Sequence, residues 1–242
     1  MSDPLVLCYH AVSADWDADL SVTPEALERQ LGVLHAKGYR GTTFEEAVGS
    51  PPARRTVAVT FDDAYRSVIR FARPILDALG WPGSVYVPTG FAGSERPMSW
   101  PGIDHWAGSP HAQELVPMSW DELRELAGSG WEVGSHTRTH PHLTQLDDAE
   151  LERELHESRT ECERQMGRPC TTIAYPYGDV DGRVVAAARA AGYRQGGALP
   201  AKHHRPRPLE WPRIGVYHAD GDLRFRLKAS PLVGRIRAAR RL

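Results

Sequence analysis

The stretch that decides the fold is Val57–Tyr65, with the sequence VAVTFDDAY. Its first five residues are mostly apolar and do not alternate with polar ones, which is typical of a parallel-sheet strand covered on both faces. It ends in two adjacent carboxylates, Asp62 and Asp63. Functional groups of α/β proteins gather at the C-terminal ends of strands. Because neighbouring side chains of an extended chain point in different directions, we expect one carboxylate to hold a metal and the other to handle a proton. A helix cap is the alternative, but it accounts for only one of them.

Size and composition restrict the class of protein. A chain of 242 residues fits one large α/β domain, since barrels of about 250 residues are ordinary single domains. The formal net charge of −2 gives no indication of nucleic acid as a partner. No apolar run approaches the ~20 residues of a membrane span. The first residues lack the basic region and hydrophobic core of a secretory signal. We therefore expect a single domain over residues 1–242, located in the cytoplasm.

The three cysteines, Cys8, Cys162 and Cys170, are an odd number without a C-x-x-C pair. Free and mostly buried thiols in a reducing cytosol are the expected state. A bridge between Cys162 and Cys170 is the alternative.

Strand and helix patterns alternate along almost the whole chain. Strands are predicted at residues 5–10, 39–43, 57–61, 84–88, 130–136, 171–175, 193–198 and 211–216. Helices are predicted after Thr23, at 44–48, after Asp63, at 119–127, from 147 onward and at 184–191, with a kink at Pro74. Residues 90–117 lack periodicity and form a long loop, in which His105 and His111 are expected to be exposed. The alternation favours a parallel sheet wrapped by helices, as a barrel or partial barrel.

Two histidines four residues apart, His136 and His140, form the second strong signal. On a helix this spacing is typical of zinc proteases, but no glutamate follows the first histidine here. Gly134 and Pro141 argue instead for a loop at a strand exit. Two unrelated histidines among the eleven of the chain are the alternative. With Asp63, the pair makes a two-histidine, one-carboxylate set that leaves positions open for water and substrate, as a catalytic zinc requires.

Three short motifs in this order resemble those of a known family. They are Thr60–Asp63 (TFDD), Ser135–His140 (SHTRTH) and Tyr175–Gly178 (YPYG). Their order and spacing are similar to the polysaccharide deacetylase family, carbohydrate esterase family 4, whose catalytic unit is the NodB homology domain. The resemblance covers residues 5–216, nearly the whole chain. It implies a distorted (β/α)7-type barrel and metal-dependent hydrolysis of N-acetyl groups on sugars.

The resemblance also implies roles for single residues. Asp62 matches the general base that activates water. Asp63, His136 and His140 match the ligands of a divalent metal, with Zn²⁺ expected and Co²⁺, Ni²⁺ or Fe²⁺ as alternatives. The backbone N–H of Tyr177 matches the oxyanion donor. This role suits it, because the preceding proline has no N–H and a fixed φ and can present the next amide.

Two positions depart from the family pattern. The third motif usually begins with an arginine that orients the catalytic aspartate. Ala174 occupies that place, and Arg213 at a neighbouring strand end is the candidate substitute. The late histidine that serves as general acid is also not evident, and His10 and His218 are the candidates. We favour His10, because the strand at residues 5–10 resembles the N-terminal strand of family members that carry the acid there. A closed barrel places its first and last strands side by side, so either origin can reach the site.

These roles predict a metal-dependent carbohydrate N-deacetylase, a hydrolase of carbon–nitrogen bonds other than peptide bonds. Metal-bound water would be the nucleophile, deprotonated by Asp62, and His10 would protonate the leaving amine. The first alternative is a deformylase or other C–N hydrolase acting on a lipid-linked sugar or small amide. The second is an inactive carbohydrate-binding homologue, against which the intact Asp62, Asp63, His136 and His140 argue.

Two further features have competing interpretations. Trp211 and Leu209 would wall a pocket for the acetyl methyl group, unless they are ordinary core residues. The basic C-terminal tail, residues 223–242, is either a solvated terminal helix or an amphipathic surface that rests on an anionic membrane from the cytoplasmic side. Membrane contact would make a lipid-linked sugar an attractive substrate.

Overall fold

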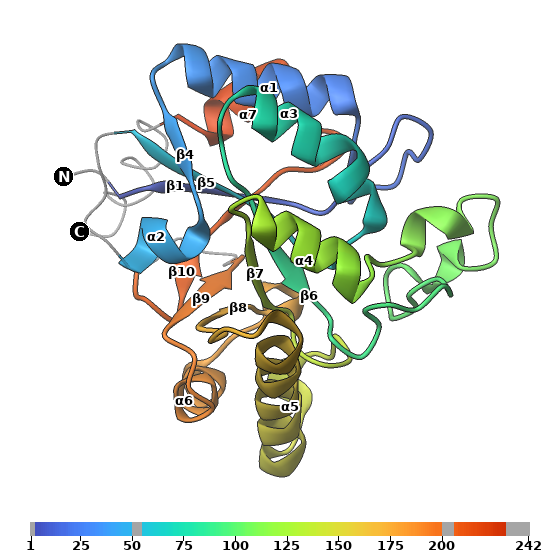
Figure 1. The fold of residues 1–242 in the computed structure, drawn as a ribbon, viewed down its shortest axis with the longest axis vertical. Helices are drawn as coiled ribbons and strands as arrows, with labels where there is room; N and C mark the ends of the chain where they lie inside the picture. The colour runs from blue at the N-terminus through green and yellow to red at the C-terminus, as the bar shows by residue number, and fades with distance from the viewer. Residues whose placement is uncertain (1–2, 50–54, 200–205, 231–242) are drawn as a thin grey trace.

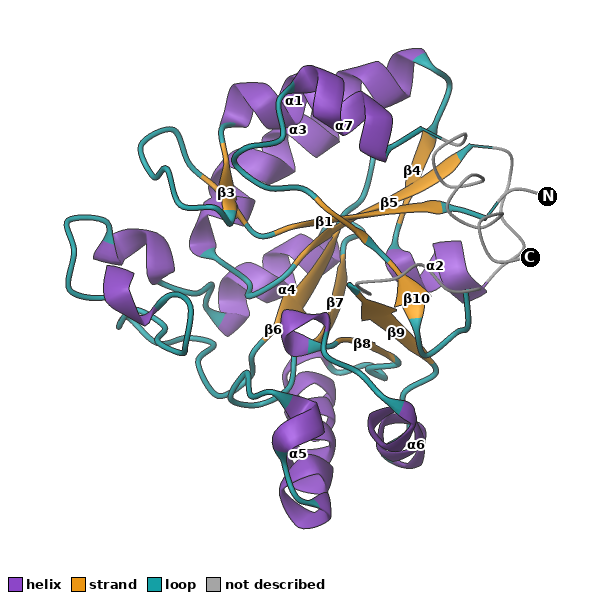
Figure 2. Cartoon of the chain, turned by 180° about the vertical axis from the view of Figure 1, so that it is seen from behind, coloured by secondary structure: helices purple, strands orange, loops and turns teal. Residues whose placement is uncertain are grey.

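The computed structural model describes residues 3–49, 55–199 and 206–230. In these ranges a parallel sheet lies at the centre and helices surround it (Figure 1, Figure 2). The strands are β1 (Leu5–Tyr9), β2 (Ala11–Val12), β3 (Ser21–Val22), β4 (Arg40–Thr42), β5 (Thr56–Phe61), β6 (Ser84–Val87), β7 (Glu132–Ser135), β8 (Thr172–Ala174), β9 (Gln195–Ala198), β10 (Trp211–Pro212) and β11 (Ile214–Gly215). The α-helices are α1 (Pro24–Ala36), α2 (Phe44–Gly49), α3 (Arg73–Ala78), α4 (Trp120–Gly128), α5 (Asp148–Met166), α6 (Gly182–Ala190) and α7 (Asp222–Lys228).

The larger sheet closes on itself almost completely. Its order is β10-β9-β8-β7-β6-β5-β1-β11, with every pair parallel, and β4 pairs with the beginning of β5. β2 and β3 form a separate parallel pair. The strands at the two ends of the order, β10 and β11, are consecutive in the chain and separated only by Arg213. This segment therefore joins both edges of the sheet, and the predicted distorted barrel is confirmed.

β5 occupies the middle of the barrel wall, as the VAVTF pattern predicts. Every residue of β5 except the first is buried, and the strand pairs with β1 over five residues, from Leu5 opposite Val57 to Tyr9 opposite Phe61. The N–H of Asp62 continues this pairing by donating to the carbonyl of Tyr9 at 2.9 Å. The two carboxylates thus begin where the strand ends.

Three helices begin at or next to their predicted starts, and each has a side-chain cap. Thr23 caps α1 by accepting a hydrogen bond from the N–H of Ala26, and Pro24 is the first helical residue. α4 and α5 each begin with a capping box, Ser119 with Glu122 and Asp147 with Glu150. Such reciprocal bonds satisfy backbone N–H groups that a helix start otherwise leaves without partners.

The segment after Asp63 shows the predicted break at Pro74. A π-helical turn covers Val68–Ala72, and α3 begins at Arg73 with Pro74 in its first turn. The helical segment starts at Arg66, three residues beyond Asp63, and neither aspartate accepts a hydrogen bond from its backbone, so the helix-cap interpretation of the two aspartates is wrong. Both carboxylates are left free for other partners.

Glu132, at the start of β7, is a buried acid that forms hydrogen bonds with three other elements. Its carboxylate accepts hydrogen bonds from Ser84 on β6 and Thr172 on β8, and from the N–H of Glu45 on α2. Burial raises the pKa of Glu132 above its ordinary value, against the effect of these donors. The acid and its three donors link two neighbouring strands and a helix to β7.

Three predictions need correction or refinement. The single strand predicted at residues 211–216 splits at Arg213, because β10 pairs with β9 while β11 pairs with β1. The loop at 90–117 contains two short 3₁₀ turns, at Asp104–Trp106 and Ala112–Leu115. In this loop His105 is exposed as predicted, whereas His111 is half-buried edge-on against Trp106.

The cysteines follow the expectation of free thiols, since Cys8, Cys162 and Cys170 are buried and unpaired. None of the helices in the described ranges combines the length and apolar character that a membrane span needs. Of the basic tail, α7 is described, and residues 231–242 lie outside the described residues.

Candidate active site

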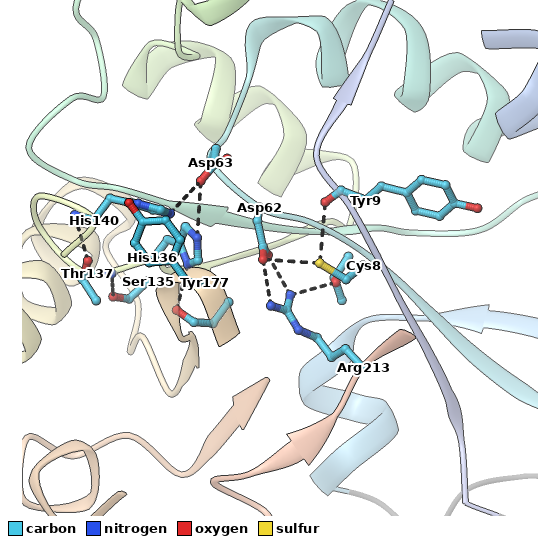
Figure 3. Close-up of polar contacts among 12 residues, drawn as sticks. Cys8, Tyr9, Asp62, Asp63, Ser135, His136, Thr137, His140, Tyr177 and Arg213 are labelled. Carbon is cyan, nitrogen blue, oxygen red and sulfur yellow. Dashed lines mark hydrogen bonds and ion pairs between the residues drawn. The ribbon is translucent and has the colours of Figure 1, made fainter. Parts of the chain in front are cut away.

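The predicted site residues come together at one end of the barrel. Each lies at or just beyond the C-terminal end of a strand: His10 after β1, Asp62 and Asp63 after β5, His136 and His140 after β7, Tyr177 after β8, and Arg213 between β10 and β11. Figure 3 shows the two neighbouring carboxylates turned to different partners, Asp63 toward two imidazoles and Asp62 toward Arg213. A parallel barrel brings these loops to one face, although the residues span most of the chain.

Several of these residues have unusual backbone conformations. Asp63, His140 and Tyr177 have φ values of 67°, 62° and 58°, in the left-handed region that non-glycine residues rarely occupy. Thr137 and Ala64, next to site residues, share this conformation. Each such residue costs of order 1 kcal/mol or more, and such strain clusters at functional sites where the surrounding structure enforces it. The turn at Asp63 is what separates the directions of the two aspartates.

Asp63, His136 and His140 form a compact buried cluster. Asp63 Oδ1 lies 3.3 Å from Nε2 of His136 and 3.3 Å from Nε2 of His140. A tetrahedral or octahedral ion bound at about 2.0–2.2 Å requires ligand atoms roughly 3.0–3.5 Å apart, so this spacing fits a metal. Asp63 Oδ1 is buried without a hydrogen-bond partner among the described residues. A cation between the three side chains would satisfy it.

The two imidazoles present the nitrogens that a metal needs. His136 Nδ1 donates to the carbonyl of Ala174 at 2.8 Å, which leaves Nε2 facing Asp63. Burial lowers the pKa of His140 to about 3, so its imidazole is neutral and can offer a lone pair. Burial also acts to lower the pKa of His136, but the carboxylates of Asp62 and Asp63 outweigh it and raise that pKa.

Asp62 has a different environment, dominated by one arginine. Both of its oxygens accept hydrogen bonds from Arg213, Nη1 to Oδ1 and Nη2 to Oδ2, each at 2.7 Å. Burial alone would raise the pKa of Asp62, but the guanidinium overcomes burial and holds it below its usual range. Asp62 is therefore ionised at neutral pH. Arg213 makes the contact that a family arginine would make from the position of Ala174, but it reaches Asp62 from the segment that closes the barrel.

Two further residues support this pair and were missed in the sequence. Cys8 Sγ donates to Asp62 Oδ2 at 3.3 Å, and Thr60 Oγ1 accepts from Arg213 Nη1 at 3.2 Å. Burial raises the pKa of the Cys8 thiol well above its ordinary value, so it acts as a neutral donor. Cys8 lies two residues before His10, and Thr60 two residues before Asp62. The two-residue period of strands places such neighbours on one face, which is the signal that could have found them.

Of the two candidate acids, His10 lies in the site and His218 lies on the surface. One ring nitrogen of His10 is within 4.8 Å of a carboxylate oxygen of Asp62, and the residue is 9% exposed. Its ring is stacked on Tyr217 with centroids 6.4 Å apart. His218 is exposed, and its N–H donates to the carbonyl of Asp19.

Tyr177 offers its backbone to the site and its side chain to the rim. In the described ranges, its N–H donates to no carbonyl or side chain, so it is available to an incoming oxygen. Its hydroxyl donates to the carbonyl of Pro101 at 3.1 Å. Its ring is stacked on His142 with centroids 3.8 Å apart and meets His140 edge-on. Burial raises the pKa of the Tyr177 hydroxyl to about 12, which keeps it neutral.

The long loop at 90–117 also reaches the site, through a residue that the sequence pattern does not single out. The Trp100 ring is stacked on the His140 ring, with centroids 4.1 Å apart and planes inclined by 20°. Trp100 is itself packed against Phe91. The predicted pocket walls Leu209 and Trp211, in contrast, pack into hydrophobic clusters with Tyr175 and with Phe44 respectively. The ordinary-core interpretation holds for both.

Comparisons with known proteins agree with this geometry. The family model described as polysaccharide deacetylase matches residues 49–196. YxkH of Bacillus subtilis is 26% identical over 196 residues, which cover 79% of this chain and 62% of YxkH. The poly-beta-1,6-N-acetyl-D-glucosamine N-deacetylase of Staphylococcus aureus is 25% identical over 210 residues, covering 80% of this chain and 67% of that enzyme. The chain thus spans about two thirds of the length of these curated relatives.

A solved structure matches almost end to end. The Streptococcus pyogenes deacetylase PplD, solved in complex with acetate, superposes with a TM-score of 0.77 at 22% identity, covering 94% of this chain and 98% of PplD. At this identity the likeness establishes the fold alone. The family model covers more than half of the chain and includes the three motifs that meet at the end of the barrel. The chain belongs to the polysaccharide deacetylase family.

Proposed function

We propose that the protein removes N-acetyl groups from an acetamido sugar in a glycan or glycoconjugate by metal-dependent hydrolysis. The observation that carries the proposal is the division between neighbouring aspartates, with Asp63 among two imidazoles and Asp62 ion-paired to Arg213. The Staphylococcus aureus relative, whose name gives poly-beta-1,6-N-acetyl-D-glucosamine as substrate, supports an N-acetylglucosamine polymer as the first substrate to test.

Asp63, His136 and His140 would hold a divalent cation, with Zn²⁺ the ion we propose because two imidazole nitrogens and one carboxylate oxygen suit it. When bound, the cation would polarise the amide carbonyl and lower the pKa of a water molecule from 15.7 toward about 7. Three protein ligands leave further coordination positions open, as a catalytic metal requires.

The remaining residues divide the proton and charge transfers among them. Asp62, kept ionised by Arg213, takes a proton from the attacking water. The free N–H of Tyr177 donates to the oxygen on which negative charge develops. His10, which has a ring nitrogen within 4.8 Å of a carboxylate oxygen of Asp62, gives a proton to the departing nitrogen. A carbon–oxygen bond forms, the carbon–nitrogen bond breaks, and the products are acetate and a sugar amine.

Metal content and acetate release together test this division of roles. Asp62→Asn should keep its metal and lose about 10²–10⁴ in kcat, since it removes only the base. Asp63→Asn, the matched change at the next residue, should lose both metal and activity. The metal content of each purified variant is measured. The release of acetate or formate is then measured with acetylated, formylated and lipid-linked sugars. Near-normal turnover by Asp62→Asn would disprove the assignment of the base, and formate release alone would favour a deformylase.

A further inference from the structure

The proposed oxyanion donor belongs to a residue with an uncommon backbone conformation. Tyr177 has φ 58° and ψ 3°, in the left-handed region that non-glycine residues rarely occupy. The turn around it makes two backbone hydrogen bonds, from the N–H of Gly178 to the carbonyl of Tyr175 and from the N–H of Asp179 to the carbonyl of Pro176. The N–H of Tyr177 takes part in neither. Contacts other than its own hydrogen bond must therefore hold this amide in place.

The Tyr177 side chain is held at two points rather than by burial. It is 38% exposed, so packing in the core does not fix it. Its hydroxyl donates to the carbonyl of Pro101 at 3.1 Å. Its ring is stacked on the ring of His142, with centroids 3.8 Å apart and planes inclined by only 11°. A further ring contact, with His140, is edge-on with centroids 4.7 Å apart. His142 thus covers one face of the tyrosine ring.

Asp179 restrains the imidazole of His142. Its Oδ2 lies 3.5 Å from Nδ1 of His142, and the same oxygen accepts a hydrogen bond from Thr144 Oγ1. Asp179 follows Tyr177 by two residues, whereas His142 lies in the segment after β7. The ring stack and the carboxylate contact therefore join the same two segments, and each limits movement in the other.

The backbone that follows His142 is also fixed. Arg183, in the first turn of α6, donates through Nη2 to three carbonyl oxygens at 2.9–3.3 Å, those of Leu143, Thr144 and Leu146. These bonds attach the segment after His142 to the helix that follows the Tyr177 turn. The imidazole thus lies on a restrained backbone, as a side chain that positions another residue requires.

The stack and the carboxylate contact can be removed separately. Stacking requires only the flat faces of two rings, so it does not depend on a proton on the imidazole. His142→Phe keeps an aromatic face and loses the polar atom near Asp179. His142→Asn keeps a polar group at about the position of Nδ1 and loses the aromatic face. The side chain of His142 is 40% exposed, so neither change empties a core position.

We propose that His142 is a positioning residue, which by stacking on Tyr177 holds the N–H of that residue toward the oxygen on which charge develops. The proposal rests on the proposed function for the task of this N–H, whereas the stack itself is a property of the fold. A preorganised donor stabilises charge without having to reorient during the reaction. A mobile Tyr177 amide should therefore slow the reaction without weakening the binding of substrate or metal.

The mobility of the Tyr177 amide tests this without any turnover. In protein labelled with ¹⁵N-tyrosine, the chain gives signals only from its eight tyrosines, and the signal that Tyr177→Phe lacks belongs to Tyr177. We expect an amide order parameter of about 0.85 for Tyr177 in the wild type and in His142→Phe, and a fall toward about 0.6 in His142→Asn. The other tyrosine amides should be unchanged in both variants.

The outcomes separate this proposal from the proposed function. A Tyr177 amide that is as rigid in His142→Asn as in wild type, or equally mobile in both variants, overturns the proposal even if acetate is released. Loosening of all the tyrosine amides in His142→Asn would also overturn it, since the proposal confines the change to Tyr177. Mobility of Tyr177 alone, in His142→Asn and not in His142→Phe, supports the proposal even if no acetylated sugar is hydrolysed.

In an active enzyme, the same pair of variants should differ in kcat rather than KM. His142→Asn should lose about tenfold in kcat, less than the 10²–10³ that removal of a whole oxyanion donor costs. Its KM and its affinity for Zn²⁺ should stay within about twofold of wild type, because the stack acts on the transition state. His142→Phe should recover kcat to within about threefold of wild type, since it restores the stack. Equal kcat in the two variants would contradict a role for the ring.

Discussion

At the scale of single residues, the two neighbouring aspartates owe their difference to what surrounds them. Asp63 lies between imidazoles and its Oδ1 has no hydrogen-bond donor among the described residues, while Asp62 accepts from a guanidinium and a thiol. The left-handed conformation at Asp63 turns the chain sharply after the strand, and the two carboxylates make their close contacts with different side chains. Only one of them is held as a permanent anion next to a fixed positive charge.

Removing that positive charge should change the pH dependence of the reaction. In Arg213→Ala, burial acts on Asp62 with its main opposition removed, so the pKa of Asp62 rises and the base becomes protonated at higher pH. We expect the acidic limb of the kcat/KM profile to move to higher pH. Arg213→Lys keeps the charge but loses the two-point contact, so the acidic limb of its kcat/KM profile should move less. An unchanged limb in Arg213→Ala would contradict this account of Asp62.

The same pair should affect stability. Because the folded-state pKa of Asp62 is depressed, its ion pair stabilises the fold above the ordinary aspartate value of about 3.9, and this contribution is lost as the pH falls below it. Leaving the buried carboxylate without its partner in Arg213→Ala should cost about 3–5 kcal/mol at pH 7. Urea unfolding at pH 7 measures the loss.

At the scale of elements, the long loop at 90–117 is part of the site rather than a spacer. It supplies Trp100 to His140 and the carbonyl of Pro101 to Tyr177. A loop without periodicity gives no sequence signal for such contacts, because they depend on how the barrel brings its strand ends together. Its length alone predicts a loop that is either functional or mobile.

Trp100→Ala should weaken metal binding although all three candidate ligands remain. The variant removes the ring that fixes the orientation of His140, and loss of such supporting contacts typically costs 10–100-fold in metal affinity. We expect the affinity for Zn²⁺, measured by titration against a competing chelator, to fall about tenfold. Trp100→Phe, which retains an aromatic face, should recover most of it. Equal affinity in wild type and Trp100→Ala would show that His140 needs no such support.

The buried acid of β7 gives a prediction about the barrel wall. Glu132→Ala leaves three donors without an acceptor and should cost roughly 3 kcal/mol or more. Glu132→Gln keeps an acceptor and should cost less. Because the folded-state pKa of Glu132 is raised, the wild type loses stability as the pH rises above the ordinary glutamate value of about 4.3, and the glutamine variant does not. The difference in unfolding free energy between Glu132→Gln and wild type should therefore move in favour of the variant between pH 5 and pH 8.

At the scale of the whole molecule, the segment that closes the barrel also contributes a residue to the site. The segment that joins β9 to β1 carries Arg213, and the ligand cluster draws on β5 and β7. An unfolded chain does not hold these residues together, so a metal would bind the folded state and stabilise it.

Metal should raise the melting temperature accordingly. At a free concentration of one hundred times Kd, binding adds about 2.7 kcal/mol, which for a chain of this size is roughly 5–10 °C. Thermal unfolding with Zn²⁺ and with a chelator measures the shift. His136→Ala should show little of it, and an equal shift in that variant would place the bound metal elsewhere.

Much of the fold was predictable, because it rests on local patterns. The alternation of elements, the caps at Thr23, Ser119 and Asp147, and the break at Pro74 follow from side chains close in sequence. The split at Arg213 was not predictable, since it depends on which strands lie at the two edges of the sheet. The cytoplasmic location and membrane contact through the tail stay predictions.

The sequence by itself determined which residue types stand at the strand ends, because apolar runs and turn residues fix where each strand stops. Only the tertiary structure decided that Cys8, Thr60 and Arg213 surround Asp62 and that Trp100 covers His140. The physical reason is that local conformation depends on near neighbours, whereas charge pairing, stacking and enclosure depend on distances that barrel closure alone sets.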